Sequence, residues 1–166
     1  MYARRQRDGV TVAAMRLDRG VIRWSVILYI ALLLPVSLLH ESGHALVCSA
    51  SGFGYSLWLD GRGGHILCAG APSDAVVYGA MGGVFGLVGS GAMIALWMAR
   101  KHAAILVVGL AYAVDQAAKA VLEGLFAPVY ISGSMDLYIT ALQLASWIGF
   151  MLYFARRPSR PVSIKT

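Results

Sequence analysis

The sequence is short of charged residues. Only 13% of its 166 residues are Asp, Glu, Lys or Arg, whereas 58% are hydrophobic and the mean hydropathy is +0.68. A soluble domain carries about 25% charged residues and about 45–50% apolar ones. The few charges gather at the two ends and in short stretches, with long uncharged runs between them. This scarcity argues against an ordinary soluble domain and is typical of an integral membrane protein.

Acidic residues are scarcer than basic ones, which gives a net charge of +6. The basic residues form three clusters beside apolar runs: near the N-terminus, at Arg100 and Lys101, and near the C-terminus. No aromatic–basic platform of the kind that binds nucleic acids accompanies them, so we expect no nucleic-acid partner. We interpret the clusters as cytoplasmic flanks of membrane spans, with membrane lipid as the surrounding partner.

Cysteine is also scarce. Cys48 and Cys68 are the only two, and they are not spaced as a Cys-x-x-Cys ligand pair. We expect two small buried thiols. The alternative is a disulfide, which would form if both face an oxidising compartment.

Long apolar segments predict four transmembrane helices, at about residues 21–49, 73–99, 103–124 and 134–155. Between the first two predicted helices, residues 52–70 have alternating apolar positions on either side of an Asp-Gly-Arg-Gly-Gly stretch. This pattern predicts a β-hairpin or re-entrant loop. We therefore expect an all-α polytopic membrane protein. Its membrane-embedded domain covers residues 21–155, between a basic arm (1–20) and a basic tail (156–166).

Four spans place both termini on one side of the membrane. All three basic clusters then fall on that side, while the loop at 125–133 has neither Lys nor Arg. Because basic residues are enriched in cytoplasmic loops, we expect both termini of this protein to lie on the cytoplasmic side of the cell membrane.

The second span is rich in glycine at three- and four-residue spacings: Gly79, Gly82, Gly83, Gly86, Gly89 and Gly91. Glycines so spaced share a helix face and let another helix approach closely. We interpret this stripe as a packing surface without chemistry of its own.

The sequence His40-Glu41-Ser42-Gly43-His44 lies near the C-terminal end of the first span. Two histidines four residues apart share one helix face, where both imidazoles can bind the same metal ion. The glutamate between them can act as general base on a metal-bound water. Because such groups are costly inside an apolar segment unless paired or coordinated, we expect His40 and His44 to be zinc ligands and Glu41 the catalytic base. A hydrogen-bonded histidine pair in the core is the alternative.

A catalytic zinc takes three protein ligands and a water. Chain topology limits the third ligand to the end of the third span, the following loop or the start of the fourth span. Asp115 and Glu123 each have Lys119 as a partner four residues away, whereas Asp136 has no local cation. We therefore predict Asp136 as the third ligand, with Asp115 and then His65 of the hairpin as alternatives.

Several stretches together resemble the site-2 protease class of intramembrane zinc metalloproteases, and more closely its short M50B-like members. They are HESGH at the end of a membrane helix, the GRGGHILCAG stretch, the small-residue helix AMGGVFGLVGSGA and the GSMD start of a later helix. The resemblance covers about residues 22–155. It implies that His40, His44 and Asp136 bind zinc, that Glu41 is the catalytic base, and that the substrate is a membrane-embedded peptide.

The chain departs from that class at two points. Many members carry an Asn in the helix after the hairpin and a Gly after the third-ligand Asp. This chain contains no Asn, and Leu137 follows Asp136.

Two other function classes stay open. A non-catalytic accessory subunit of a larger membrane complex would keep the helical frame and a structural metal, and the small size and the glycine stripe favour it. A metal carrier or transporter is indicated by the acidic and basic residues of the third span. Glu41 favours an enzyme, because a purely structural metal site has no use for a base. A zinc endopeptidase is the leading expectation.

Overall fold

A computed structural model describes residues 15–61, 63–131 and 133–158 of the chain. Four of its helices are long and apolar enough to cross a membrane: α1 (Arg19–Ala50), α2 (Ala75–Arg100), α3 (Ala103–Leu125) and α5 (Asp136–Ala155). A short helix, α4 (Ala127–Ile131), lies between the last two. The predicted all-α architecture with four spans is confirmed, and each span ends within two residues of its predicted limits.

The predicted hairpin is present after α1. Strands β2 (Tyr55–Asp60) and β3 (Gly63–Cys68) pair antiparallel, with Tyr55 opposite Cys68 and Asp60 opposite Gly63. Strand β3 lies directly on α1, because the amide of Gly64 donates a hydrogen bond to Ser37 Oγ at 2.7 Å. A Cβ atom at Gly64 would stand only 2.8 Å from Cγ of Glu41, so the strand can approach this closely only with glycine there.

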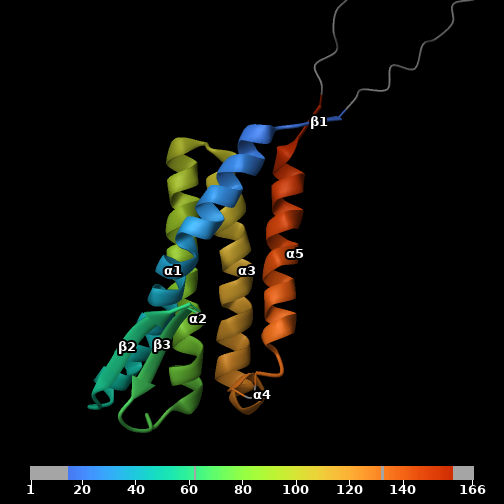
Figure 1. Cartoon of the computed structure of the whole chain (residues 1–166). Coiled ribbons are helices and arrows are strands. Elements are labelled where there is room, and N and C mark those ends of the chain that lie inside the picture. Colours follow the sequence, from blue (N-terminus) through green and yellow to red (C-terminus); the bar gives the residue numbers. More distant parts are fainter. Residues whose placement is uncertain (1–14, 62, 132, 159–166) are drawn as a thin grey trace, which may run out of the picture.

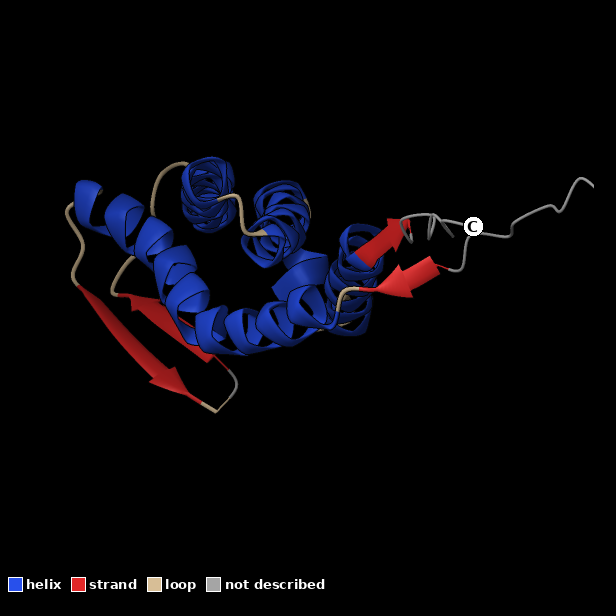
Figure 2. Ribbon diagram, turned by 90° about the horizontal axis from the view of Figure 1, so that it is seen from above, coloured by secondary structure: helices blue, strands red, loops and turns tan. Residues whose placement is uncertain are grey.

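A second pair of strands joins the two ends of the membrane domain. Strand β1 (Met15–Leu17) pairs antiparallel with β4 (Arg156–Pro158), immediately before α1 and after α5 (Figure 2). The sequence did not predict these strands. The remainder of the basic arm and tail, residues 1–14 and 159–166, lies outside the described residues.

Helices α2, α3 and α5 run side by side, α1 crosses them at an angle, and the hairpin lies on the outer side of α1 (Figure 1). The most extensive contact between helices is that of α2 with α3. A Cβ atom at Gly79 would overlap the carbonyl oxygen of Glu123, and one at Gly83 would overlap the backbone nitrogen of Ala120. These two glycines therefore let the helix backbones touch, as predicted for the stripe.

The apolar core lies in the half of the bundle that is remote from the hairpin. The ring of Tyr29 on α1 stacks on Tyr112 of α3 at 5.2 Å and on Trp147 of α5 at 4.5 Å, between ring centroids. The hydroxyl of Tyr112 donates to the carbonyl of Tyr29 at 2.7 Å, which satisfies a buried polar group. This cluster fixes the angle at which α1 crosses α3.

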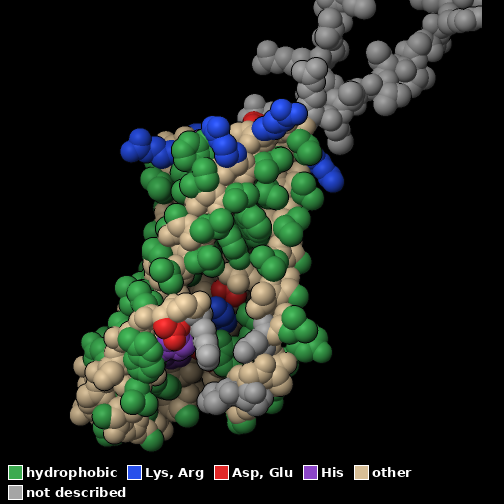
Figure 3. Space-filling model, in the orientation of Figure 1, with side chains coloured by type: hydrophobic (Ala, Val, Ile, Leu, Met, Phe, Trp, Pro, Cys, Tyr) green, Lys and Arg blue, Asp and Glu red, His purple; other side chains and the backbone are tan. Residues whose placement is uncertain are grey.

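The outer surface is apolar along the helices and basic at one end. Large side chains such as Ile30, Val88 and Tyr153 are 62–70% exposed, as expected where lipid replaces water. Exposed Lys and Arg side chains gather at the end that carries β1 and β4 (Figure 3): Arg19, Arg23, Arg100, Lys101 and Arg156. The hairpin and the HESGH sequence lie toward the other end.

Candidate metal centre

The two histidines of the HESGH sequence point from α1 toward α2 and α3. His40 and His44 are 6% and 7% exposed. Helix α2 approaches α1 here because residue 43 is glycine, and a Cβ atom at Gly43 would overlap the carbonyl of Met81. Gly82 of α2 faces the imidazoles themselves, since a Cβ atom on it would overlap Nε2 of His44 and stand 2.6 Å from Nε2 of His40.

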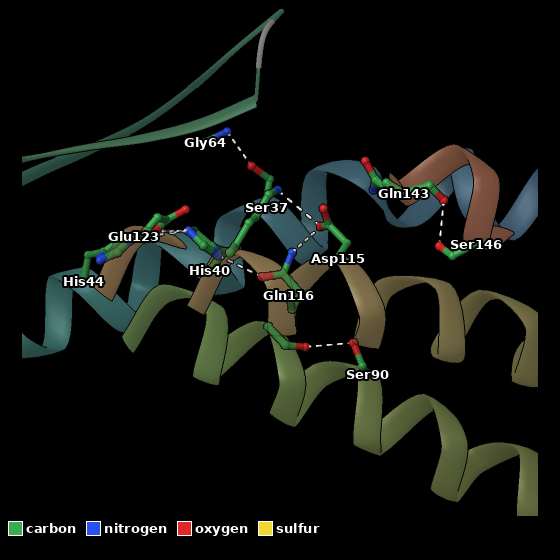
Figure 4. Close-up of polar contacts among 12 residues, drawn as sticks. Ser37, His40, His44, Gly64, Ser90, Asp115, Gln116, Glu123, Gln143 and Ser146 are labelled. Carbon is green, nitrogen blue, oxygen red and sulfur yellow. Dashed lines mark hydrogen bonds and ion pairs between the residues drawn. The ribbon is translucent and has the colours of Figure 1, made fainter. Parts of the chain in front are cut away.

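Glu123 of α3 completes a group of three buried donors (Figure 4). Its Oε2 atom lies 3.1 Å from Nε2 of His40 and 3.1 Å from Nε2 of His44, and the two Nε2 atoms are 3.2 Å apart. The three atoms therefore form a nearly equilateral triangle. They come from two helices, and Glu123 is more than 70 residues away from either histidine in the sequence.

The partners of the other imidazole nitrogens fix the tautomer of both histidines. Nδ1 of His44 lies 2.7 Å from the backbone carbonyl of Tyr78, which only accepts, so this nitrogen carries the proton. Nδ1 of His40 lies 2.8 Å from Oε1 of Gln116, which also only accepts. In the neutral imidazole each Nε2 is then an unprotonated lone pair. Two nitrogen lone pairs and a carboxylate oxygen thus face one another inside the protein.

This donor set fits a divalent metal ion. Three lone pairs at this spacing repel one another, and a proton placed on any one of them can lie on only one edge of the triangle. Ligand atoms bound to a tetrahedral zinc at 2.0–2.1 Å are about 3.3 Å apart, close to the 3.1 and 3.2 Å found here. Two imidazoles and a carboxylate are also an established ligand set for zinc. The structure therefore contains a group that can hold a metal ion.

A cavity of about 760 Å³ opens beside the donors. Figure 3 shows acidic and basic side chains in a recess on this face, with acidic and histidine side chains on the surface nearby. Its lining comes from α1, the hairpin, α2, α3 and α4, and includes the three donors together with Ser37, Glu41, Trp58, Gly64, His65, Tyr78, Lys119 and Tyr130. A substrate could reach the donors from this cavity.

Glu41 lines the same cavity and is half-buried. Its side chain lies under strand β3, where Gly64 leaves room for it. Within the described ranges no side chain or backbone amide donates a hydrogen bond to its carboxylate. Glu41 is thus a carboxylate beside the candidate metal ligands that is left available to act on a molecule in the cavity.

None of the three residues that the sequence offers as a third ligand is among the three donors described above. Asp136 begins α5, but its side chain lies outside the described residues, so its relation to the histidines stays a prediction. Asp115 is paired with Lys119, at 3.2 Å between Oδ2 and Nζ, and is not among the three donors. His65 lines the cavity but binds Asp60 Oδ1 at 2.9 Å through its Nε2.

Glu123 is not among the ligands that the sequence predicts, because Lys119 is its expected partner four residues away. In the structure Lys119 turns to Asp115 instead, which frees Glu123 for the histidines. The number of charges on α3 could have indicated Glu123 as a ligand. One lysine, Lys119, cannot neutralise both Asp115 and Glu123 in an apolar helix, so one of the two carboxylates needs another cation.

The expectation of two free buried thiols is wrong. Cys48 and Cys68 form a disulfide, with Cα atoms 5.9 Å apart. The hairpin turns back on itself, so Cys68 at the end of β3 returns to the level of Cys48, one turn beyond His44 on α1. The covalent bond holds the hairpin against the helix that carries both histidines.

No family model, curated protein or solved structure matches this chain. What is established is a membrane-type helical bundle with a buried His–His–Glu group at one end and a cavity beside it.

Proposed function

We propose that this chain is an intramembrane zinc metalloprotease that cleaves a membrane-embedded peptide. One observation carries the proposal: two histidine lone pairs and the Glu123 carboxylate converge on one point beside a cavity that also holds Glu41. Structural zinc sites close with four protein ligands, whereas catalytic sites use three and keep a position open. Three donors and an open cavity, as found among the described residues, favour the catalytic kind.

The residues of the chain divide the work of hydrolysis. Bound zinc supplies a Lewis acid that polarises the scissile carbonyl and promotes ionisation of a water. Glu41 accepts the proton of the attacking water and passes it to the leaving amine, as a general base and then a general acid. The cavity walls keep the peptide at the donors and shield the reaction from lipid. The backbones of His40, His44 and Glu123 stay fixed relative to one another, because these residues belong to two long helices that pack together.

We also infer the orientation in the membrane. The exposed basic residues gather at the end that carries β1 and β4, and cytoplasmic flanks are enriched in Lys and Arg. The Cys48–Cys68 disulfide lies toward the other end, and disulfides persist in oxidising compartments rather than in the cytosol. Both observations favour cytoplasmic termini in the cell membrane and a metal centre that lies near the opposite, non-cytoplasmic side.

The Glu41→Gln variant tests the enzyme proposal, since it keeps the shape of the side chain and removes the base. Purified wild-type and variant protein would be placed in lipid vesicles with a library of single-span peptides, and products detected by mass spectrometry. We expect both proteins to bind one zinc ion per chain, and only the wild type to release products.

An accessory subunit of a larger membrane complex predicts another result. The wild type would then bind zinc and cleave nothing, and Glu41→Gln would leave the activity of the complex unaltered. Such an outcome would refute the protease proposal while keeping the metal site.

A further inference from the structure

A buried chain of hydrogen bonds leads away from the metal centre along α3. Gln116 is 1% exposed and its Oε1 atom lies 2.8 Å from Nδ1 of His40. The Nε2 atom of the same amide donates to Oδ2 of Asp115 at 2.8 Å. Asp115 is itself 1% exposed and receives a second contact from Nζ of Lys119 at 3.2 Å. The chain therefore runs from a carboxylate through an amide to a candidate zinc ligand (Figure 4).

Donors and acceptors can be assigned to this series of hydrogen bonds in only one way when Asp115 is ionised. The Asp115 carboxylate can only accept, so the amide must present its NH₂ group to Asp115 and its oxygen to His40. The amide oxygen can then only accept from His40, which places the imidazole proton on Nδ1. The Asp115 carboxylate thus determines, two hydrogen bonds away, that Nε2 is the unprotonated nitrogen of the neutral His40 imidazole.

Fold stability alone does not account for Asp115. A buried carboxylate is costly even when paired, and an apolar side chain of similar size would often serve stability as well or better. Here one of its oxygens, Oδ1, has no hydrogen-bond partner among the described residues, which adds to the cost. Helix α2 leaves room for the Gln116 side chain because residue 86 is glycine. A Cβ atom at Gly86 would overlap the amide oxygen of Gln116.

We propose that Asp115 is a positioning residue that acts through Gln116 to orient the His40 imidazole for metal binding. Ligating histidines generally need a fixed partner on the second nitrogen, and loss of that partner typically lowers metal affinity by about 10–100-fold. The proposal rests on the metal centre of the proposed function, but it concerns how that centre is set and not which reaction it performs.

The test begins with the wild type and needs no variant. Nitrogen-15 spectra of metal-free protein, labelled at its 4 histidines and assigned by single His→Gln substitutions, report which nitrogen of a neutral imidazole carries the proton. We expect His40 to be protonated at Nδ1 and unprotonated at Nε2. A proton on Nε2 would overturn the proposal whether or not the protein binds zinc or cleaves peptides.

A double-mutant cycle then tests the route. Zn²⁺ affinity is measured by competition with a chelating dye for wild type, Asp115→Asn, Gln116→Met and the double variant, and the visible spectrum of the Co²⁺ form monitors ligand geometry. We expect each single change to weaken Zn²⁺ binding by about 10–100-fold, and the double change to weaken it no further than Gln116→Met alone. Gln143→Met on α5, remote from the site, is the matched control and should bind Zn²⁺ like the wild type.

Other results point to other roles. If Asp115→Asn weakens Zn²⁺ binding equally with Gln116 present and absent, Asp115 acts on the metal without the amide and the proposal fails. If Asp115→Asn lowers thermal stability but leaves the His40 tautomer and Zn²⁺ affinity unchanged, the carboxylate serves packing only, and the proposal fails as well.

Discussion

Gly82 is the position where the smallest chemical change should most disturb the candidate metal centre. A Cβ atom on this residue would overlap Nε2 of His44 and stand 2.6 Å from Nε2 of His40, whereas Cβ atoms essentially never come within 3.0 Å of a heavy atom from a non-neighbouring residue. A methyl group in Gly82→Ala therefore has to displace two of the three donor atoms. It would also occupy space that zinc needs, because zinc lies about 2.0–2.1 Å from an imidazole nitrogen.

The size of the effect follows from these contacts. Loss of a single outer partner of a ligand lowers metal affinity by about 10–100-fold. Since Gly82→Ala moves two ligands directly, we expect Zn²⁺ affinity to fall by at least about 100-fold, or about 2.7 kcal/mol. The metal-free protein should change less. Ala favours a helix over Gly by about 0.5–1 kcal/mol, and overpacking costs about 1–3 kcal/mol, so the net loss of stability should be about 0–2.5 kcal/mol.

Gly91 on the same helix provides the matched control. No atom lies within 4 Å of a Cβ built at this position. Gly91→Ala should therefore bind Zn²⁺ like the wild type and unfold at a slightly higher temperature. Competition titration for Zn²⁺ and thermal unfolding of metal-free protein, both in the same detergent, measure the two quantities. A Gly82→Ala protein with wild-type Zn²⁺ affinity would refute the placement of the metal between the two Nε2 atoms.

Three further predictions follow from the same geometry. Glu123→Gln should weaken Zn²⁺ binding by more than about tenfold while Asp136→Ala leaves it unchanged, and the reverse result by titration would restore Asp136 as the third ligand. Replacing Cys48 and Cys68 together by Ala should lower the free energy of unfolding by about 3 kcal/mol, as expected for a loop of this size, and alkylation of unreduced protein should find no free thiol. In that cysteine-free background, single cysteines at His102 and Phe126, at opposite ends of α3, should react with impermeant reagents from the cytoplasmic and the non-cytoplasmic side respectively. Labelling of both from one side would contradict a membrane-spanning α3.

The sequence predicts the histidine pair because a four-residue spacing is a local property of a helix. The third donor is not local. Asp115, Lys119 and Glu123 are evenly spaced on α3, so Lys119 can pair with either carboxylate. Which carboxylate pairs with Lys119, and which one reaches the histidines, depends on the turn of α3 that lies level with the imidazoles. That alignment is determined by the contact of Gly79 with the backbone of Glu123, a contact between helices that no spacing within α3 could reveal.

The disulfide was within reach of sequence reasoning. Residues 52–70 were predicted to form a hairpin, and a hairpin returns its last strand to the place where the first began. The partner of Cys68 across the two strands is Tyr55, a few residues after α1 ends at Ala50. Cys48 is in the last turn of that helix. A thiol at each of these two places therefore meets the other if the hairpin folds back along α1, which is the arrangement that the structure has.

In the glycine stripe of α2, the sequence pattern alone does not distinguish glycines that let helices pack from glycines that leave room for the candidate metal centre. Gly79 and Gly83 face the backbone of α3, as a packing surface should, but Gly82 faces the two imidazoles and Gly86 faces the amide of Gln116. Both uses need a position without a side chain, so both leave the same small-residue pattern. They are also linked in space, because the close approach of α2 and α3 at Gly79 and Gly83 brings the Glu123 carboxylate to the histidines, and the space left at Gly82 keeps the donor triangle clear.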